Sequence, residues 1–156
     1  NNMVISSMNN PEISKNFNFR LLTGTSLYDE AKAKSQKSAD IISYSEDMKT
    51  HYEWANLVIA RSGAGVISEC ALYSLPQILV PYPYAADNHQ VANAKYFEDN
   101  AGAWVLNQKD ENNSKLVDIL LEISKNRELL IQVTEKSFKC ARINAAIDTV
   151  KFFFQE

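Results

Sequence analysis

Residues 57–94 read LVIARSGAGVISECALYSLPQILVPYPYAADNHQVANA, which contains two strand–turn–helix patterns in succession. Leu57–Ala60 has the length and β-branched content of a buried parallel strand, and the small residues of Gly63–Gly65 follow it as a tight turn. We expect a helix over Val66–Tyr73, a second strand over Gln77–Pro81 and a further helix that begins at Asp87–Gln90. Open α/β sheets bind nucleotides where two neighbouring strand ends offer polar groups to one crevice.

The helix expected after Gly65 makes this turn a candidate phosphate site. The first N–H groups of a helix have no partner within it, and the positive end of its dipole attracts anions. Glu69 lies about one turn into the helix, where its carboxylate could accept two sugar hydroxyls. Because the surrounding positions are apolar, this carboxylate needs a partner to offset its desolvation. Ligand hydroxyls could serve, and so could Arg61.

Taken alone, the glycines are a weak signal, because small residues at a strand–helix turn also occur simply for close packing. The third glycine of the dinucleotide fingerprint is absent, and the acid follows Gly65 by four residues instead of by about 20, which counts against NAD. No GK[ST] phosphate loop is present, which makes an NTPase a poor candidate. His89 has no second metal-type ligand near it in the sequence, so a metal site is not expected.

Composition describes an ordinary globular domain. The 156 residues are 46% hydrophobic and 22% charged, and the net charge of −3 argues against a nucleic-acid surface. No apolar run approaches the roughly 18 residues that a membrane span needs. Cys70 and Cys140 have no CxxC or Cys/His pattern, and we expect them to be reduced and buried in a cytoplasmic protein.

Strands and helices are expected to alternate along the chain, which predicts an α/β fold with a Rossmann-like parallel sheet flanked by helices. The chain opens on a helical pattern, which suggests a piece of something larger whose first strand is missing. The other expected strands are Phe17–Thr23, Ala39–Tyr44 and Gly102–Leu106, and the other expected helices are residues 1–9, Leu27–Lys37, Glu46–Ala55, a helix capped by Asn113-Ser114, Arg127–Lys139 and Asn144–Phe154. The last three form a helical tail, about residues 113–156.

Three segments in combination resemble a known family. The segments RSGAGVISE (61–69), LPQILVPYPY (75–84) and DNHQVANA (87–94) are similar to the C-terminal half of the MurG family, the bacterial UDP-N-acetylglucosamine (UDP-GlcNAc) transferases that convert lipid I to lipid II. The similarity extends over nearly the whole chain. It implies that residues 1–156 form the donor-binding, C-terminal domain of a GT-B glycosyltransferase. It also implies a separate N-terminal acceptor domain, which we expect to be absent from this chain.

The resemblance also implies roles for individual residues. The backbone at Ser45 would meet the uracil, Glu69 the ribose hydroxyls and Gln90 the GlcNAc hydroxyls, with His89 and Asn93 in support. Residues 64–68 would hold the diphosphate region. The rest of the predicted donor site, which shares the turn and the helix that follows, is Arg61, Ser62, Gly63, Ala64, Gly65, Val66, Ile67 and Ser68.

Two positions depart from the family's usual pattern. Gly65-Val66 stands where Leu-Thr or a similar pair is usual, which removes a hydroxyl and permits a closer backbone approach. Ser45 stands where an apolar residue is usual, which a backbone contact would tolerate.

The expected reaction follows from the resemblance. The hydroxyl of lipid I attacks the sugar C1 as UDP leaves, and the helix dipole stabilises the leaving diphosphate, so neither a metal nor another cofactor is expected. Catalytic residues are expected in the missing domain and none in this chain, which would be inactive alone. The enzyme would lie peripherally on the cytoplasmic side of the bacterial inner membrane, with membrane contact through the missing domain and this fragment soluble.

Two alternatives remain open. The chain could be the nucleotide-sugar-binding subunit of a split GlcNAc transferase that pairs with a separate acceptor-domain chain. It could instead be a non-catalytic interaction domain that kept the fold and lost the ligand, in which case Glu69→Ala would be silent in every binding assay.

Overall fold

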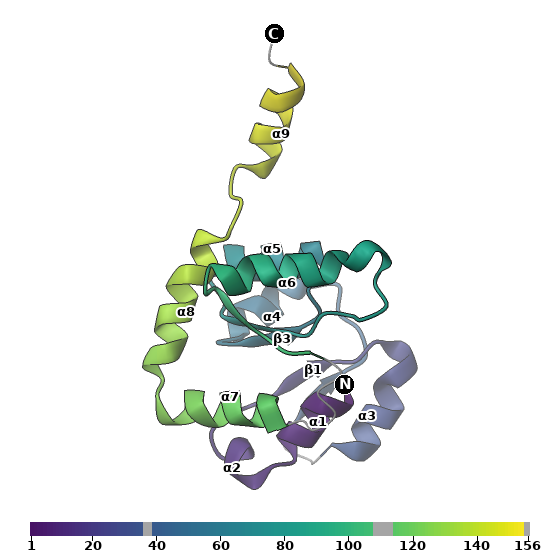
Figure 1. Ribbon diagram of the computed structural model, residues 1–156. Coiled ribbons are helices and arrows are strands. Elements are labelled where there is room, and N and C mark those ends of the chain that lie inside the picture. The colour runs from purple at the N-terminus through teal and green to yellow at the C-terminus, as the bar shows by residue number, and fades with distance from the viewer. Residues whose placement is uncertain (36–38, 108–113, 155–156) are drawn as a thin grey trace. The chain divides into compact units, whose positions relative to one another are not determined.

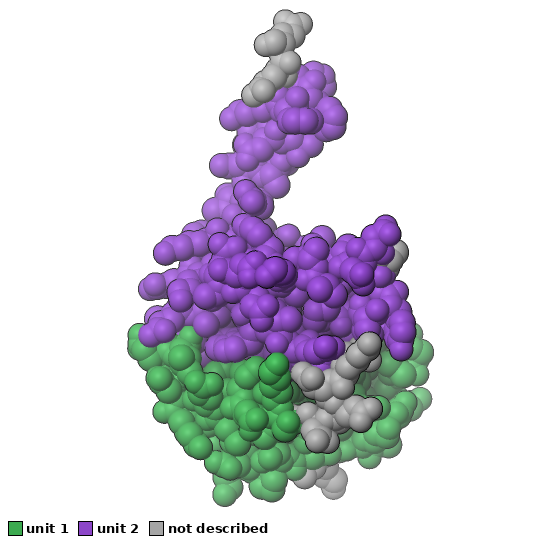
Figure 2. Space-filling view, viewed as in Figure 1, with its two compact units in different colours: residues 1–51, 109–129 green, residues 52–108, 130–156 purple. Residues whose placement is uncertain are grey.

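The computed structural model describes residues 1–35, 39–107 and 114–154 (Figure 1). The chain divides into two compact units, which Figure 2 colours separately. Unit 1 comprises residues 1–51 and 109–129, and unit 2 comprises residues 52–108 and 130–156. Each unit contains its own parallel strands.

Unit 1 contains a two-stranded parallel sheet and several helices. Strand β1 pairs with β2, with Leu21 opposite Ile41. Helices α1 and α2 pack with α7, whose buried residues are Leu116, Leu120 and Ile123. The elements are α1 (Asn2–Met8), α2 (Pro11–Ser14), β1 (Arg20–Leu22), the 3-10 turn η1 (Thr25–Leu27), α3 (Tyr28–Lys34), β2 (Asp40–Ile42) and α7 (Ser114–Lys125).

Unit 2 contains a three-stranded sheet in the order β3-β4-β5, with all strands parallel. Its elements are β3 (Val58–Ala60), α5 (Ala64–Leu72), β4 (Gln77–Leu79), η2 (Ala86–Asn88), α6 (His89–Asp99), β5 (Ala103–Val105) and α9 (Ala145–Phe154). Two further helices, α4 (Met48–Trp54) and α8 (Glu128–Lys139), run from the end of a unit 1 segment into unit 2.

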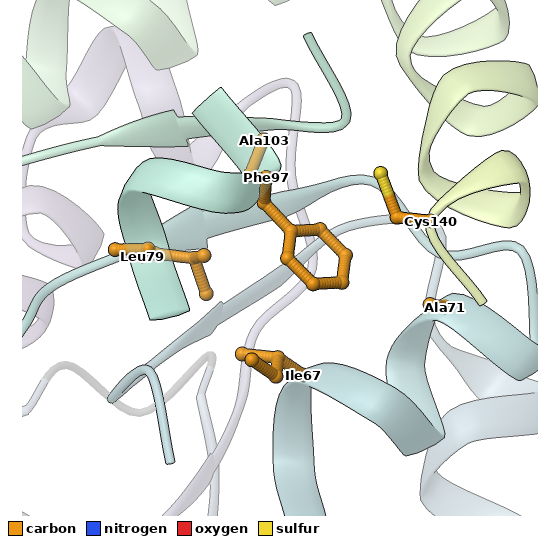
Figure 3. Packing of buried hydrophobic residues seen from close by; sticks show 7 residues of the cluster. Ile67, Ala71, Leu79, Phe97, Ala103 and Cys140 are labelled. Carbon is orange, nitrogen blue, oxygen red and sulfur yellow. The ribbon is translucent and has the colours of Figure 1, made fainter. Parts of the chain in front are cut away.

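The central strand β4 is buried along its whole length, as a parallel strand covered on both faces should be. Beside it lies the core of unit 2, where the Phe97 ring of α6 sits among side chains from the neighbouring elements (Figure 3). The cluster comprises Ile67 and Ala71 of α5, Leu79 of β4, Ala94 and Phe97 of α6, Ala103 of β5 and Cys140. Helices α5 and α6 are therefore held on the sheet by their apolar faces.

Gly102 permits a close approach between the end of α8 and the start of β5. A Cβ atom at Gly102 would lie 3.1 Å from the Cys140 sulfur and 3.1 Å from the Cα of Ser137, which is tighter than nearly all real contacts. A side chain at this position would therefore require the end of α8 to move by a few tenths of an ångström. Both cysteines are free and buried, as expected from the sequence.

The predicted order of strands and helices is confirmed, including three final helices with no strand between them in the described part of the chain. Element boundaries differ. The strands are three residues long, shorter than expected. Helix α5 begins at Ala64, so Ala64 and Gly65 belong to its first turn and not to the preceding loop. Asn10 begins a short additional helix, α2, by accepting N–H bonds from Glu12 and Ile13. The predicted cap Asn113 lies outside the described residues.

Candidate functional site

The amino end of α5 is open. Its first residue follows the N-cap Gly63, which has φ −68° and ψ 141° and supplies no side-chain hydrogen bond. The first backbone bond of the helix runs from the Ile67 N–H to the Gly63 oxygen over 3.1 Å. The N–H groups of Ala64, Gly65 and Val66 precede that bond and have no acceptor within the helix. They point, with the positive end of the dipole, beyond the carboxyl end of β3.

Glu69 lies on the exposed side of α5, one turn after Gly65. Its Oε1 atom lies 4.0 Å from the place that a Cβ atom on Gly65 would occupy, which puts this oxygen beside the first turn of the helix. Its Oε2 atom accepts a hydrogen bond from the Tyr52 hydroxyl over 2.7 Å. The structure therefore gives Glu69 a protein partner that the sequence did not indicate, Tyr52 of α4. The predicted contact of Glu69 with ligand hydroxyls stays a prediction.

Tyr52 is a buried side chain whose ring packs on Tyr73 with 5.3 Å between ring centroids. Burial, and then the hydrogen bond to Glu69, raise the pKa of the Tyr52 phenol above its ordinary value. The phenol consequently keeps its proton and acts as the donor in the pair.

The second helix start at this edge of the sheet is formed by η2 and α6. Asp87 and Asn88 adopt positive φ angles of 50° and 53°, which aspartate and asparagine tolerate better than most residues. Asn88 is the N-cap of α6 and makes no side-chain capping bond. The predicted helix start at Asp87–Gln90 is confirmed. Because β3 and β4 are paired and parallel, their carboxyl ends bring the starts of α5 and α6 to the same edge.

Hydrogen bonds join the start of α6 to the end of β3 and to the loop after β4. The Ser62 hydroxyl, fully buried, donates to the backbone oxygen of Gln90 over 2.7 Å. The Asn93 side chain donates a hydrogen bond from Nδ2 to the Ser62 backbone oxygen over 3.0 Å. The Gln90 Oε1 atom accepts from the Tyr82 N–H over 2.9 Å. Ser62 and Asn93 therefore fix the start of α6 against the end of β3.

Arg61 holds the loop after β4. Its Nη1 atom donates to the backbone oxygens of Val80 and Pro81 over 3.1 and 3.2 Å. Its guanidinium carbon lies 5.3 Å from the centre of the Tyr82 ring, within the range of a cation–π contact. The sequence pattern marked Arg61 as part of the site but did not indicate these contacts.

The structure brings most of the predicted site residues to one edge of unit 2. Residues 61–66, Ser68, Glu69, His89, Gln90 and Asn93 lie at or just beyond the carboxyl ends of β3 and β4. Ile67 differs from the others, because its side chain belongs to the core and its N–H is bonded to Gly63. Ser45 belongs to unit 1, where its hydroxyl accepts the Asp47 N–H over 3.2 Å. Its predicted contact with a base stays a prediction.

Neither a metal centre nor a membrane span is found in the described residues. Those residues contain no group of three His, Cys, Asp or Glu side chains that could hold an ion. Within the same part of the chain, no helix combines the length and the apolar character needed to cross a bilayer.

Parallel strands whose carboxyl ends lead into helix starts define an α/β domain of the Rossmann type. Comparison with known families agrees with this class. The chain belongs to glycosyltransferase family 28, because the profile described as "Glycosyltransferase family 28 C-terminal domain" matches residues 1–150.

Curated relatives carry the name UDP-N-acetylglucosamine–N-acetylmuramyl-(pentapeptide) pyrophosphoryl-undecaprenol N-acetylglucosamine transferase. The one from Leptospira interrogans is 54% identical over 154 residues, which is 99% of this chain and 43% of the relative. The one from Psychromonas ingrahamii is 37% identical over 145 residues, 91% of this chain and 40% of the relative. The chain thus spans less than half the length of these relatives.

A solved structure shares the fold. The crystal structure of Acinetobacter baumannii MurG superposes with a TM-score of 0.79 and 26% identity, over 97% of this chain and 46% of that one. The family resemblance and the fold class expected from the sequence are both confirmed.

Proposed function

We propose that this chain binds UDP-GlcNAc as the donor domain of a transferase that passes GlcNAc to a lipid-linked acceptor. The observation that carries the proposal is the open amino end of α5 with the Glu69 carboxylate beside its first turn. Unpartnered N–H groups and a positive dipole suit the diphosphate, and a carboxylate suits the two ribose hydroxyls. The names of the relatives support the same donor.

Gln90 is assigned to the sugar. Its side-chain oxygen is engaged by the Tyr82 N–H, which leaves the amide NH₂ to donate to GlcNAc hydroxyls. His89, the exposed first residue of α6, and Asn93, which fixes this helix to Ser62, support the same end of the donor.

In the reaction, the acceptor hydroxyl attacks the sugar C1 as UDP leaves. Negative charge builds up on the leaving diphosphate, and the N–H groups of Ala64, Gly65 and Val66 stabilise it without a metal ion. The general base and the lipid-binding surface belong to a separate acceptor domain, which also makes the peripheral contact with the cytoplasmic face of the membrane. Residues 1–156 alone are accordingly inactive in forming lipid II from UDP-GlcNAc and lipid I.

Calorimetric titration tests the proposal. UDP and UDP-GlcNAc are titrated into the protein, expressed at the full length that its gene encodes, and into its Glu69→Ala and Gln90→Ala variants. Glu69→Ala should weaken both ligands by about 1–3 kcal/mol, as expected for the loss of a charged acceptor. Gln90→Ala should weaken only the ligand that carries the sugar. Absence of UDP binding by the unaltered protein, or a silent Glu69→Ala, would contradict the proposal and favour a non-catalytic interaction domain.

A further inference from the structure

Tyr52 is joined to the predicted ribose-binding carboxylate, although no motif includes it. It lies on α4, outside the strand–turn–helix pattern that carries the site. Its side chain is only 7% exposed, whereas Glu69 belongs to the exposed face of α5. The 2.7 Å bond between the Tyr52 hydroxyl and Glu69 Oε2 therefore joins a fixed donor to a solvent-facing acceptor.

The donor is held rigidly. A buried tyrosine ring has few accessible rotamers, and the Tyr73 ring packs against this one. The acceptor, without such a bond, would be a surface glutamate free to exchange among many rotamers. Ordering such a side chain costs roughly 1–2 kcal/mol of conformational entropy. The bond to Tyr52 meets that cost in the free protein, before any ligand arrives.

The geometry leaves Glu69 able to bind a ligand. Each carboxylate oxygen can accept more than one hydrogen bond, and Tyr52 uses one position on Oε2. The other oxygen, Oε1, lies beside the first turn of α5, next to the N–H groups assigned to the diphosphate. A diol that follows a diphosphate by a few bonds would meet the carboxylate on this side.

We infer that Tyr52 is a positioning residue that holds the Glu69 carboxylate in the orientation that accepts the ribose hydroxyls of the donor nucleotide. This inference rests on the proposed function. It assigns to α4 a part in recognising the ribose. A purely structural alternative is that Glu69 only satisfies the buried phenol, with no effect on ligand binding.

The test compares UDP with 2′-deoxy-UDP, because only a hydroxyl contact distinguishes them. Tyr52→Phe keeps the ring packing and removes the hydroxyl that donates to Glu69. We expect it to weaken UDP binding by about three- to tenfold, the loss of roughly one hydrogen bond, and to weaken 2′-deoxy-UDP binding by a smaller factor, because that nucleotide keeps only one of the two ribose hydroxyls. Tyr73→Phe is the matched control, because it removes a neighbouring phenol and leaves the Tyr52–Glu69 bond in place. It should change neither affinity.

A second variant serves if Tyr52→Phe proves unstable. Glu69→Asp shortens an exposed side chain, which pulls the carboxylate away from Tyr52 at little risk to folding. It should also lower the preference for UDP over 2′-deoxy-UDP. Adding Tyr52→Phe to it should weaken UDP binding no further, because the two residues act as one unit.

Three results would count against the inference. Tyr52→Phe could weaken the two nucleotides equally, it could leave the UDP affinity unchanged, or its effect could persist in full on the Glu69→Asp background. Each would overturn the role of Tyr52 while UDP binding by the unaltered protein still supported the proposed function. If the unaltered protein bound neither nucleotide, the proposed function and this inference would fail together.

Discussion

The Ser62 hydroxyl donates a 2.7 Å hydrogen bond to the backbone oxygen of Gln90, across 28 residues of sequence. This bond joins the end of β3, where the diphosphate is assigned, to the start of α6, where the sugar is assigned. Asn93 makes a second connection by bonding to the Ser62 backbone oxygen. These two hydrogen bonds fix the start of α6 to the end of β3.

Replacing Ser62 by alanine tests this connection. The substitution removes a fully buried hydroxyl and its hydrogen bond to the Gln90 oxygen, which should lower the free energy of unfolding by about 1 kcal/mol. Urea denaturation measures the change. Ser124→Ala is the control, because its hydroxyl bonds only to Leu121 of the same helix. We expect Ser62→Ala to weaken UDP-GlcNAc more than UDP, and equal weakening would show that the bond does not orient α6 toward the sugar.

Gln90→Glu distinguishes the role of the Gln90 side-chain oxygen from that of its NH₂ group. The new carboxylate keeps an oxygen for the Tyr82 N–H but loses the NH₂ donors assigned to the sugar. UDP-GlcNAc binding should weaken by about tenfold or more, the loss of a donor plus repulsion of the diphosphate. UDP binding should weaken less. Calorimetry with both ligands measures the ratio, with Gln90→Ala as reference. A larger effect on UDP than on UDP-GlcNAc would contradict the assignment of Gln90 to the sugar.

Gly63→Asp should make the protein more stable and weaken its binding of UDP. An aspartate at this N-cap can accept from the first N–H groups of α5, and nothing lies within 4 Å of the Cβ position to obstruct it. We expect a gain of about 0.5–1 kcal/mol in stability, together with severe loss of UDP binding. Thermal unfolding and calorimetry measure the two effects.

Gly63→Asn is the control for that variant, because it caps the helix without adding charge. It should stabilise α5 by only a few tenths of a kcal/mol, because it lacks the charge that interacts with the helix dipole, and it should weaken UDP binding less than Gly63→Asp does. Undiminished UDP binding by Gly63→Asp would mean that the diphosphate lies elsewhere.

Stability should fall in alkaline solution. Burial, and then the nearby charge of Glu69, raise the pKa of the Cys70 thiol from 9 to about 12. Above pH 9 the unfolded chain loses this proton while the folded chain retains it. The contribution of the protonated Cys70 thiol to the free energy of unfolding is therefore fully present below pH 9. It is lost as the pH rises toward 12, by at most about 1.4 kcal/mol per pH unit for one thiol. The raised pKa of Tyr52 acts in the same direction.

Urea denaturation between pH 7 and pH 11 checks this dependence, and Cys70→Ala should flatten part of it. An unchanged slope in that variant would assign the dependence to other groups. Native Cys70 should also react with iodoacetamide far more slowly than the unfolded chain does.

Sequence periodicity was sufficient to predict the order of the elements, because apolar spacing reports which segments face a core. It placed the start of α5 two residues late, since Gly65 resembles a turn residue. A glycine costs little in a first helical turn, where its N–H makes no helical bond in any case. Phe17 and Phe19 resemble strand residues, but the β1–β2 pairing covers only Arg20–Leu22.

The candidate site was predictable where the signal is local. The turn, the helix start and Glu69 all lie within ten residues of each other. The contacts between Tyr52 and Glu69 and between Ser62 and Gln90 were not predictable, because they depend on where whole elements meet in space. Ile67 illustrates the same limit. It falls inside the conspicuous motif, yet its side chain serves the core.

The open amino end of α5 also allows hydrogen exchange to show whether the proposed diphosphate site is occupied. Amide hydrogens at Ala64, Gly65 and Val66 that no helical carbonyl protects should exchange rapidly with deuterated solvent. A diphosphate bound to them would slow that exchange, while the amides of β4, buried in the sheet, would be unaffected. Deuterium uptake by three consecutive residues can therefore follow donor binding in real time, without a label on either molecule.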